Sequence, residues 1–144
     1  MITVKQHLKG KTGCVWTIAP QDSVYRALEV MAKKNVGALV VVEDEKVVGI
    51  FSERDYARNV ILKGKSSKDT CVSDLMNKKV CYVRPEQTLD ECMALFTEKR
   101  TRHLPVLDGE MLIGIVSIGD AVKEYVADKE FTIQQLENYI TGSF

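Results

Sequence analysis

The sequence predicts a mixed α/β (α+β) fold made of two similar units and a C-terminal helix. Each unit has the order strand, helix, strand, strand, helix. The main observation is a repeat, because residues 18–58 align without a gap on residues 83–123, a shift of 65 positions. Nine of these 41 positions are identical, more than the roughly one in twenty expected from ordinary composition. With 144 residues and 45% hydrophobic content, we expect the two copies to pack as one compact body.

An amphipathic helix is predicted after the opening strand of each copy. Ser23 is a typical N-cap for the first helix, and Thr88 with Glu91 has the spacing of a capping box for the second. Apolar residues then follow at helical spacing, which predicts that one face of each helix is buried. They are Val24, Ala27, Leu28 and Met31 in the first copy and Leu89, Cys92, Met93 and Phe96 in the second.

A β-hairpin follows this helix in both copies. In the first copy, the strand segments 38–42 and 46–51 flank a short acidic segment, and in the second Asp108-Gly109 is a typical hairpin turn. Ser52 and Ser117 then begin the closing helices. The apolar residues expected on those helices are Tyr56, Val60 and Ile61 in the first copy and Val122, Tyr125 and Val126 in the second.

The segments outside the repeats set the expected boundaries. Residues 64–70 are polar, which indicates a flexible link, and residues 72–76 form a short helix that resembles residues 4–8. We therefore divide the chain into a first repeat with its N-terminal helix (1–68), a second repeat (69–127) and a C-terminal helical extension (128–144).

The C-terminal extension is predicted to be a separate helix. Thr132 and Gln135 have the spacing of a capping box at its start. Its apolar residues need a surface to cover them, and we expect that surface to be the protein's own domain, with a second subunit as the alternative. These residues are Ile133, Leu136, Tyr139 and Ile140.

Charge and hydropathy exclude several classes of partner. Twenty acidic and twenty basic side chains cancel, whereas a nucleic-acid-binding protein normally shows a basic excess. No apolar run approaches the roughly 18 residues of a membrane span, and residues 1–6 do not open a secretory signal. We therefore expect a cytoplasmic protein that binds neither nucleic acid nor membrane.

The four cysteines predict neither a metal site nor a disulfide framework. Cys14, Cys71, Cys81 and Cys92 are scattered, and only two histidines accompany them. Zinc ligands usually come in close pairs, and disulfide frameworks belong to smaller secreted chains. We expect four reduced thiols, with Cys92 on the apolar face of its helix.

The pattern at the end of each hairpin is the best candidate for a functional site. Gly-Ile-Phe-Ser-Glu-Arg-Asp at residues 49–55 returns as Gly-Ile-Val-Ser-Ile-Gly-Asp at residues 114–120. One interpretation is structural, since Ser-x-x-Asp caps a helix. The other is functional, since a helix N-terminus attracts phosphate and a nearby carboxylate can accept hydrogen bonds from both ribose hydroxyls. Its presence at the same point of both copies favours the functional interpretation.

On these residues the chain resembles a known family. Residues 3–127 resemble a tandem pair of cystathionine-β-synthase-type (CBS) domains, and residues 52–58, Ser-Glu-Arg-Asp-Tyr-Ala-Arg, are similar to those of small stand-alone bacterial members. The resemblance implies two repeats packed sheet against sheet with pseudo-twofold symmetry. It also implies two clefts that bind adenosyl ligands such as AMP, ADP, ATP, NAD(H) or S-adenosylmethionine, and association into a disc-shaped homodimer.

The resemblance further implies which residues bind the ligand. Asp55 and Asp120 would take the ribose hydroxyls, with Ser52 and Ser117 near the phosphate. The adenine would lie at the start of each repeat and at the head of the first hairpin strand. Those positions are Thr17, Ile18, Gly37 and Ala38 in the first copy and Tyr82, Val83, Arg102 and His103 in the second.

The two copies differ at these positions. The strand head of the second copy carries cationic or donor groups where the first has Gly and Ala, and Arg54 at the first corner aligns with Gly119 at the second. If each cleft joins the corner of one repeat to the strand head of the other, one cleft gathers the charge and should hold the more phosphorylated ligand. The opposite cleft would bind an adenosine moiety weakly or stay empty. The first cleft would combine Ser52, Arg54, Asp55, Arg102 and His103, and the second Ser117, Asp120, Gly37 and Ala38.

The leading hypothesis is a non-catalytic regulatory module that senses an adenine nucleotide and acts on an unidentified partner protein. A nucleotide-hydrolysing enzyme is disfavoured, because phosphoryl transfer normally needs several metal-binding carboxylates and each corner offers one Asp. A thiol enzyme is disfavoured because no Cys/His pairing is visible. A dimerisation scaffold with vestigial clefts is the remaining alternative.

Four other side chains have mainly structural interpretations. We expect His7 at the surface, and His103 either packed in the fold or near a phosphate, where its charge would vary around neutral pH. Trp16 and Tyr82 can stack on adenine, but we expect them to fill gaps in the core or an interface.

Overall fold

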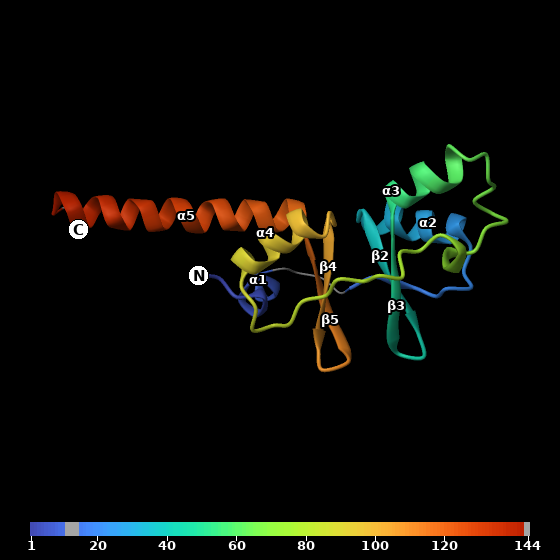
Figure 1. The fold of residues 1–144 in the computed structure, drawn as a ribbon, viewed down its shortest axis with the longest axis horizontal. Helices are drawn as coiled ribbons and strands as arrows, with labels where there is room; N and C mark the ends of the chain where they lie inside the picture. Colours follow the sequence, from blue (N-terminus) through green and yellow to red (C-terminus); the bar gives the residue numbers. More distant parts are fainter. Residues whose placement is uncertain (11–14, 143–144) are drawn as a thin grey trace.

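The computed structural model describes residues 1–10 and 15–142, and Figure 1 shows two hairpins side by side at the centre with helices on the outer sides. The elements of the first repeat are α1 (Val4–Lys9), β1 (Thr17–Ile18), α2 (Val24–Lys34), β2 (Ala38–Glu43), β3 (Lys46–Ser52), α3 (Glu53–Tyr56) and the π-helical turn η1 (Ala57–Ile61). Those of the second are the 3₁₀ turn η2 (Val72–Asp74), α4 (Leu89–Glu98), β4 (His103–Asp108), β5 (Met111–Ser117) and α5 (Ile118–Thr141).

Each repeat builds a sheet around its hairpin, as predicted. In the first repeat, β1 pairs in parallel with β2, and β2 pairs antiparallel with β3. In the second, β4 and β5 pair antiparallel in an equivalent register, so that His103 lies opposite Ser117 as Ala38 lies opposite Ser52. The last strand residue of each hairpin is therefore the serine of the repeated pattern, and it sits beside the strand head.

The opening strand of the second repeat is reduced to a single bridge between Val83 and Val106. In the first repeat the ladder extends, because the Val40 N–H donates to the Trp16 carbonyl (3.4 Å). The residue equivalent to Val40 is Pro105, which has no N–H to donate. The predicted order of five elements is thus complete only in the first repeat.

The predicted helix caps form, with one difference. Ser23 Oγ accepts the Arg26 N–H (3.1 Å) and Thr88 Oγ1 accepts the Glu91 N–H (3.2 Å), so α2 and α4 begin where the sequence predicts. The capping box expected at Thr88 lacks its second half, because the Glu91 carboxylate accepts a hydrogen bond from Gln87 Nε2 instead (3.0 Å).

The short helices before the two repeats cross over between them. Val4 of α1 is fully buried in the core of the second repeat, and Leu8 packs on Gly114 of β5. In the other direction, Met76, just after η2, packs on Gly49 of β3 in the first repeat. The N-terminal helix that the sequence groups with residues 1–68 therefore lies, in space, on the second repeat.

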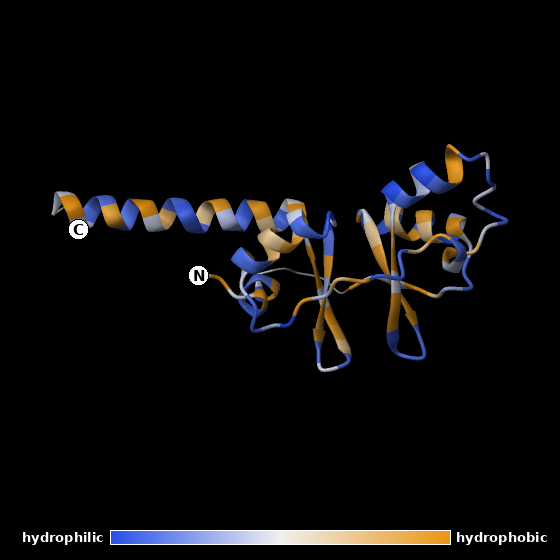
Figure 2. Cartoon of the chain, in the orientation of Figure 1, coloured by the Kyte–Doolittle hydropathy of each residue, from blue (hydrophilic) through white to orange (hydrophobic). Residues whose placement is uncertain are grey.

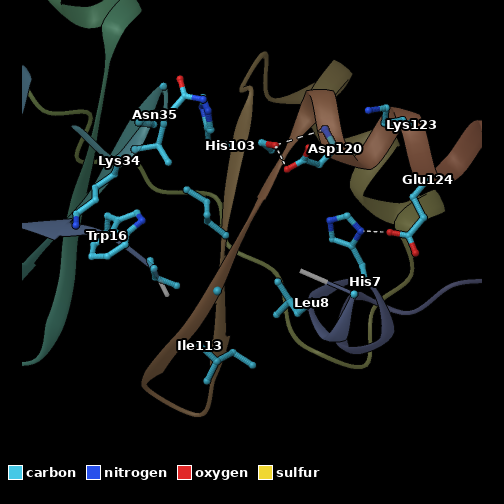
Figure 3. A pocket seen from close by; sticks show the side chains of 18 of the residues that line it. His7, Leu8, Trp16, Lys34, Asn35, His103, Ile113, Asp120, Lys123 and Glu124 are labelled. Atoms are coloured by element: carbon cyan, nitrogen blue, oxygen red, sulfur yellow. Dashed lines mark hydrogen bonds and ion pairs between the residues drawn. The ribbon is translucent and has the colours of Figure 1, made fainter. Parts of the chain in front are cut away.

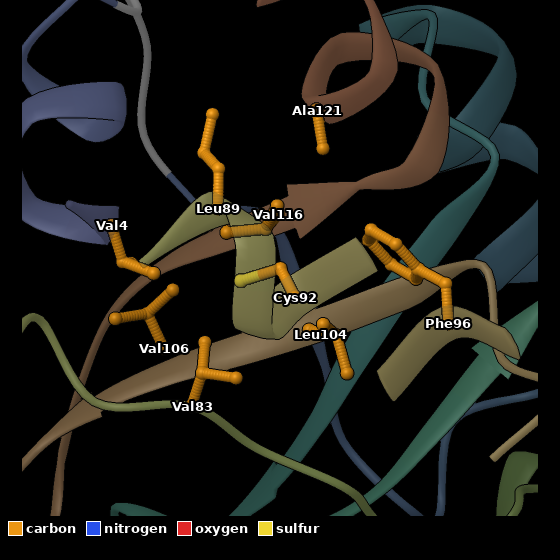
Figure 4. Packing of buried hydrophobic residues seen from close by; sticks show 9 residues of the cluster. All are labelled: Val4, Val83, Leu89, Cys92, Phe96, Leu104, Val106, Val116 and Ala121. Atoms are coloured by element: carbon orange, nitrogen blue, oxygen red, sulfur yellow. The ribbon is translucent and has the colours of Figure 1, made fainter. Parts of the chain in front are cut away.

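Each repeat has its own hydrophobic core, and Figure 4 shows that of the second. The apolar faces predicted for α2 and α4 supply much of both cores, which confirms the helical periodicity. The buried residues are Ile18, Val24, Ala27, Met31, Leu39, Val41, Phe51, Val60 and Val72 in the first repeat, and Val4, Val83, Leu89, Cys92, Phe96, Leu104, Val106, Val116 and Ala121 in the second.

The closing helix of the first repeat is short. A single α-helical turn, α3, continues into η1, in which Val60 is fully buried. Ile61, expected on the same apolar face, is 57% exposed. The wider π-helical turn changes the angle between successive side chains, so α-helical spacing does not hold there.

The closing helix of the second repeat, α5, runs unbroken over 24 residues and past the expected boundary at residue 128. Thr132, expected to cap a separate helix, lies inside α5, and its Oγ1 donates to the Asp128 carbonyl (3.0 Å). No Pro and only Gly119 stand in residues 118–141, so nothing stops the helix from propagating.

The end of α5 projects from the body of the protein (Figure 1), and Figure 2 shows apolar residues spaced along it. The prediction that this segment packs on its own domain is therefore wrong. Leu136 is 57% exposed and Ile140 81% exposed. Despite its length, α5 is not apolar enough to cross a membrane, and no other helix of the described chain is either.

Candidate functional site

The serine and aspartate of each repeated pattern cap a helix. At the first corner, Asp55 Oδ2 accepts hydrogen bonds from the Ser52 N–H and Oγ–H, both 3.0 Å, and Ser52 Oγ accepts the Asp55 N–H (3.3 Å). At the second, Ser117 Oγ donates to Asp120 Oδ2 (3.1 Å) and accepts the Asp120 N–H (3.5 Å). The structural interpretation is thus confirmed at both corners. These bonds of Asp55 use only Oδ2, so they leave room for a ligand at Oδ1.

A cleft opens beside each corner. We call the one beside the first corner the Asp55 cleft, with a volume of about 1160 Å³, and the one beside the second the Asp120 cleft, with about 1050 Å³ (Figure 3). Both are slightly larger than the usual small-molecule site of about 300–1,000 Å³. Each joins the corner of one repeat to the strand head of the other, which is the pairing that the sequence argument assumed.

The Asp55 cleft brings together Ser52, Arg54, Asp55, Arg102 and His103. Its charge is strongly positive, because six cationic side chains face only two carboxylates, Glu53 and Asp55. Such a cleft concentrates polyanions by its summed field. The six cations are Arg54, Arg58, Lys79, Lys99, Arg100 and Arg102.

Sequence reasoning missed four of these cations. Lys99 and Arg100 follow the end of α4, Lys79 lies in the segment between η2 and α4, and Arg58 lies on η1. The run Lys-Arg-Thr-Arg at residues 99–102 was a usable signal for the first two. Nothing local in the sequence signals that Lys79 and Arg58 face the same space.

The Asp120 cleft brings together Gly37, Ala38, Ser117 and Asp120, as the sequence argument expected. Its charges balance, because two further cations, Lys34 and Lys123, stand against the carboxylates of Asp120 and Glu124. It is therefore the less charged of the two clefts.

The prediction that His7 lies at the surface is wrong. His7 is 3% exposed and lines the Asp120 cleft, where its Nδ1 contacts Glu124 Oε2 of α5 (Figure 3). Burial follows from the position of α1 on β5, which no local sequence pattern reveals. His7 Nε2 is buried without a hydrogen-bond partner.

The residues expected to surround adenine divide into two groups. Gly37, Ala38, Arg102 and His103 line the clefts. Ile18 and Val83 instead belong to the two cores, and neither they nor Thr17 and Tyr82 line a cleft. The cleft walls are instead built by the residues two and three positions before Ile18 and Val83. These are Val15 and Trp16 in the Asp120 cleft and Val80 and Cys81 in the Asp55 cleft.

Trp16 and Tyr82 are not core residues. Trp16 is 36% exposed and lines the Asp120 cleft, with Lys34 Nζ 4.2 Å from its ring centroid. Tyr82 is 46% exposed, with the Arg84 guanidinium 5.0 Å from its ring centroid. Both pairs have cation–π geometry.

The cysteines within the described residues are free thiols, and one of them is buried. Burial, with smaller contributions from Glu91 and Cys81, raises the pKa of Cys92 to about 11, which disfavours its thiolate. Cys71 is exposed and Cys81 partly buried, all three being free thiols, whereas Cys14 lies outside the described residues. The described part of the chain also contains no group of three or more His, Cys, Asp or Glu side chains arranged to hold a metal ion.

Comparisons with known proteins agree with this architecture. The family model for the CBS domain matches residues 13–61 and 72–127. The chain is 44% identical over 128 residues to the mitochondrial CBS domain-containing protein CBSX3 of Arabidopsis thaliana. The aligned region covers 85% of this chain and 62% of that protein. A CBS-domain protein from Burkholderia ambifaria has a solved structure that is 53% identical, with a TM-score of 0.84 over 88% of this chain and 95% of that one. The structure of CBSX2 in complex with AMP is 29% identical, with a TM-score of 0.69 over 90% and 99% of the two chains.

Proposed function

Because the chain belongs to the CBS-domain family, we propose that it is a non-catalytic regulatory module that binds adenine nucleotides in its two clefts and signals their occupancy to a partner protein. The observation that carries the proposal is the Asp55 cleft, where a carboxylate at a strand-to-helix corner stands beside six cationic side chains. A carboxylate can accept hydrogen bonds from both ribose hydroxyls, and cations hold phosphate. The AMP complex of CBSX2 supports this ligand class.

In this proposal the two sides of the Asp55 cleft have different roles. Asp55 takes the ribose hydroxyls through the oxygen that does not cap α3, and Arg54 and Arg102 hold phosphate from opposite repeats. Because the cations outnumber the carboxylates by four, each added phosphate should gain attraction. We therefore expect ATP to bind this cleft more tightly than ADP, and ADP more tightly than AMP, with NAD(H) as a further candidate.

The Asp120 cleft should take a less charged ligand. Its two cations are balanced by two carboxylates, so a triphosphate gains little from the summed field. Trp16 offers an aromatic face at the cleft wall for the base. We expect adenosine or AMP there, held by Asp120.

A thermal-shift panel with AMP, ADP, ATP, NAD(H) and S-adenosylmethionine tests the proposal. A ligand at one hundred times its Kd adds about 2.7 kcal/mol if it binds only the folded state, which raises Tm by several degrees. The Asp55→Ala variant should lose most of the shift with ATP. Asp22→Ala is the matched control, because Asp22 also accepts a backbone N–H, that of Ala19 (3.2 Å), but lines neither cleft. Flat responses of the unmodified protein to all five compounds would overturn the proposal.

A homodimer and a cytosolic location are also part of the proposal. The apolar side chains on the projecting end of α5 support the dimer, since a second copy can bury them. They equally favour the second candidate function, a dimerisation scaffold whose clefts play no part. The double variant Asp55→Ala/Asp120→Ala separates the two: a partner still regulated without nucleotide binding would establish the scaffold.

A further inference from the structure

The two clefts share one wall, which is formed by the imidazole of His103 next to Gly37. Both residues line the Asp55 cleft and the Asp120 cleft. A Cβ added at Gly37 would lie 3.8 Å from His103 Nε2 and 3.9 Å from Glu53 Oε2. Figure 3 shows His103 between Asn35 of the first repeat and Asp120 of the second.

Backbone hydrogen bonds hold the wall from both sides. The Glu53 N–H donates to the Gly37 carbonyl (3.1 Å), and the Ile118 N–H donates to the carbonyl of the residue before His103 (2.9 Å). In the ladder, His103 lies opposite Ser117. Each strand head is therefore fixed to the corner of its own repeat, and His103 lines the cleft beside each corner.

We propose that phosphorylated ligands in the two clefts compete for His103, so that a phosphate in one cleft weakens the binding of a phosphate in the other. This inference rests on the proposed function, because it needs nucleotide in both clefts. A Cβ at Gly37 would meet both Nε2 and Cε1 of the ring, so this edge of the imidazole faces the wall that both clefts line. Two phosphates on opposite sides of the ring also repel each other. Adenosine has no phosphate and takes no part in this competition.

The proposal assigns a ligand class to each state of the protein. One phosphorylated nucleotide binds tightly, and the remaining cleft accepts an uncharged nucleoside without penalty. A hydrogen bond to a charged group is commonly worth a factor of ten or more in affinity. We therefore expect a second AMP to bind at least about tenfold more weakly than it does when the other cleft is disabled.

Isothermal titration of AMP and of adenosine into three proteins measures this effect. Asp55→Asn reports the Asp120 cleft alone and Asp120→Asn reports the Asp55 cleft alone, and Asn keeps an oxygen for each cap. In the unmodified protein the second AMP should bind about tenfold more weakly than in the matching single-cleft variant. The adenosine isotherm of the unmodified protein should equal the sum of the two variants.

Two further variants test the role of the wall itself. His103→Ala should lower AMP affinity in both single-cleft proteins and reduce the tenfold coupling to about threefold or less, because only direct repulsion is left. Gly37→Ala should change AMP affinity in both clefts together, since its methyl group contacts the ring. Gly119→Ala is the control, because its Cβ meets no atom within 4 Å and Gly119 lines neither cleft.

The outcomes distinguish this inference from the proposed function. Two AMP sites that are independent, or that strengthen each other, would overturn the inference alone. An unchanged coupling in His103→Ala would also overturn it. The same holds if the Asp55→Asn protein binds no AMP while the Asp120→Asn protein still does. No binding by any of the three proteins would overturn the proposed function, and this inference with it.

Discussion

Replacing Gly49 by alanine should destabilise the protein, although Gly49 itself lines neither cleft. Gly49 lies on β3, where the segment after η2 crosses the first repeat. A Cβ at this position would lie 2.7 Å from Met76 Sδ, 3.0 Å from Met76 Cγ and 3.1 Å from the Asn77 carbonyl oxygen. The Met76 side chain can move aside. The Asn77 carbonyl cannot move freely, because it accepts the N–H of Ile50 (3.0 Å).

The expected cost follows from these contacts. Overpacking of a tight site typically costs 1–3 kcal/mol, and the backbone contact favours the upper half of that range, about 2–3 kcal/mol. At about 4 °C per kcal/mol for a domain of this size, Tm should fall by roughly 8–12 °C. Thermal unfolding followed by circular dichroism measures the change. Nucleotide affinity, measured by calorimetry below the transition, should remain within about threefold of the original.

Two matched variants show whether the crossing segment is the cause. Gly114→Ala should cost less, because the three atoms nearest to its Cβ all belong to the flexible side chain of Leu8 (2.7 Å to both methyl carbons), which can change its rotamer. Gly119→Ala, with open space around it in the first turn of α5, should stabilise the protein slightly. A Gly49→Ala protein that melts within 2 °C of the original would refute the close packing that we describe.

The remaining predictions concern the clefts, the buried thiol and the end of α5. Arg102→Gln should weaken ATP binding about tenfold and make the affinity less sensitive to salt. Lys46 is exposed and lines neither cleft, so Lys46→Gln should leave ATP affinity unchanged. Equal losses of ATP affinity in the two variants, measured by calorimetry, would argue against the cationic cleft. Because burial raises the pKa of Cys92 to about 11, its thiol should resist iodoacetamide at pH 8 while the exposed thiol of Cys71 reacts. The free energy of unfolding should fall as the pH rises from about 9 to 11, because in that range the Cys92 thiol ionises only in the unfolded chain. Mass mapping of the labelled thiols and unfolding curves against pH check both. Removing residues 130–144 should leave Tm within a few degrees but lower the molar mass by light scattering to that of a monomer, and a truncated dimer would contradict the role given to α5.

Local structure was largely predictable from the sequence. Ser23, Thr88 and the two corner serines cap the helices that their spacing indicates, and the predicted hairpin forms, with Asp108 as the last residue of β4 and Gly109 in the turn. These features depend on hydrogen bonds between residues three or four positions apart, so a short stretch of sequence contains all the interacting groups.

Features that depend on long-range packing were not predictable in this way. His7 is buried because α1 crosses to the second repeat. Its partner there, Glu124, is 117 positions later in the sequence. The capping-box spacing at Thr132 was misleading, because Thr132 lies inside α5. Its hydroxyl donates to the Asp128 carbonyl of the same helix. A local signal for a helix start has no effect where an upstream helix propagates without a break.

The repeat by itself determined the two-unit architecture, the hairpins and the two Ser-x-x-Asp corners, because each is specified by residues close together in the chain. Only the tertiary structure decided what faces each corner. The Asp55 cleft is cationic because Lys79 and the residues 99–102 of the second repeat are brought to a corner of the first. The same packing places His103 in the wall of both clefts. The net charge of each cleft and the coupling between the clefts depend on residues that are far apart in the sequence. The packing of the two repeats decides which of these residues meet.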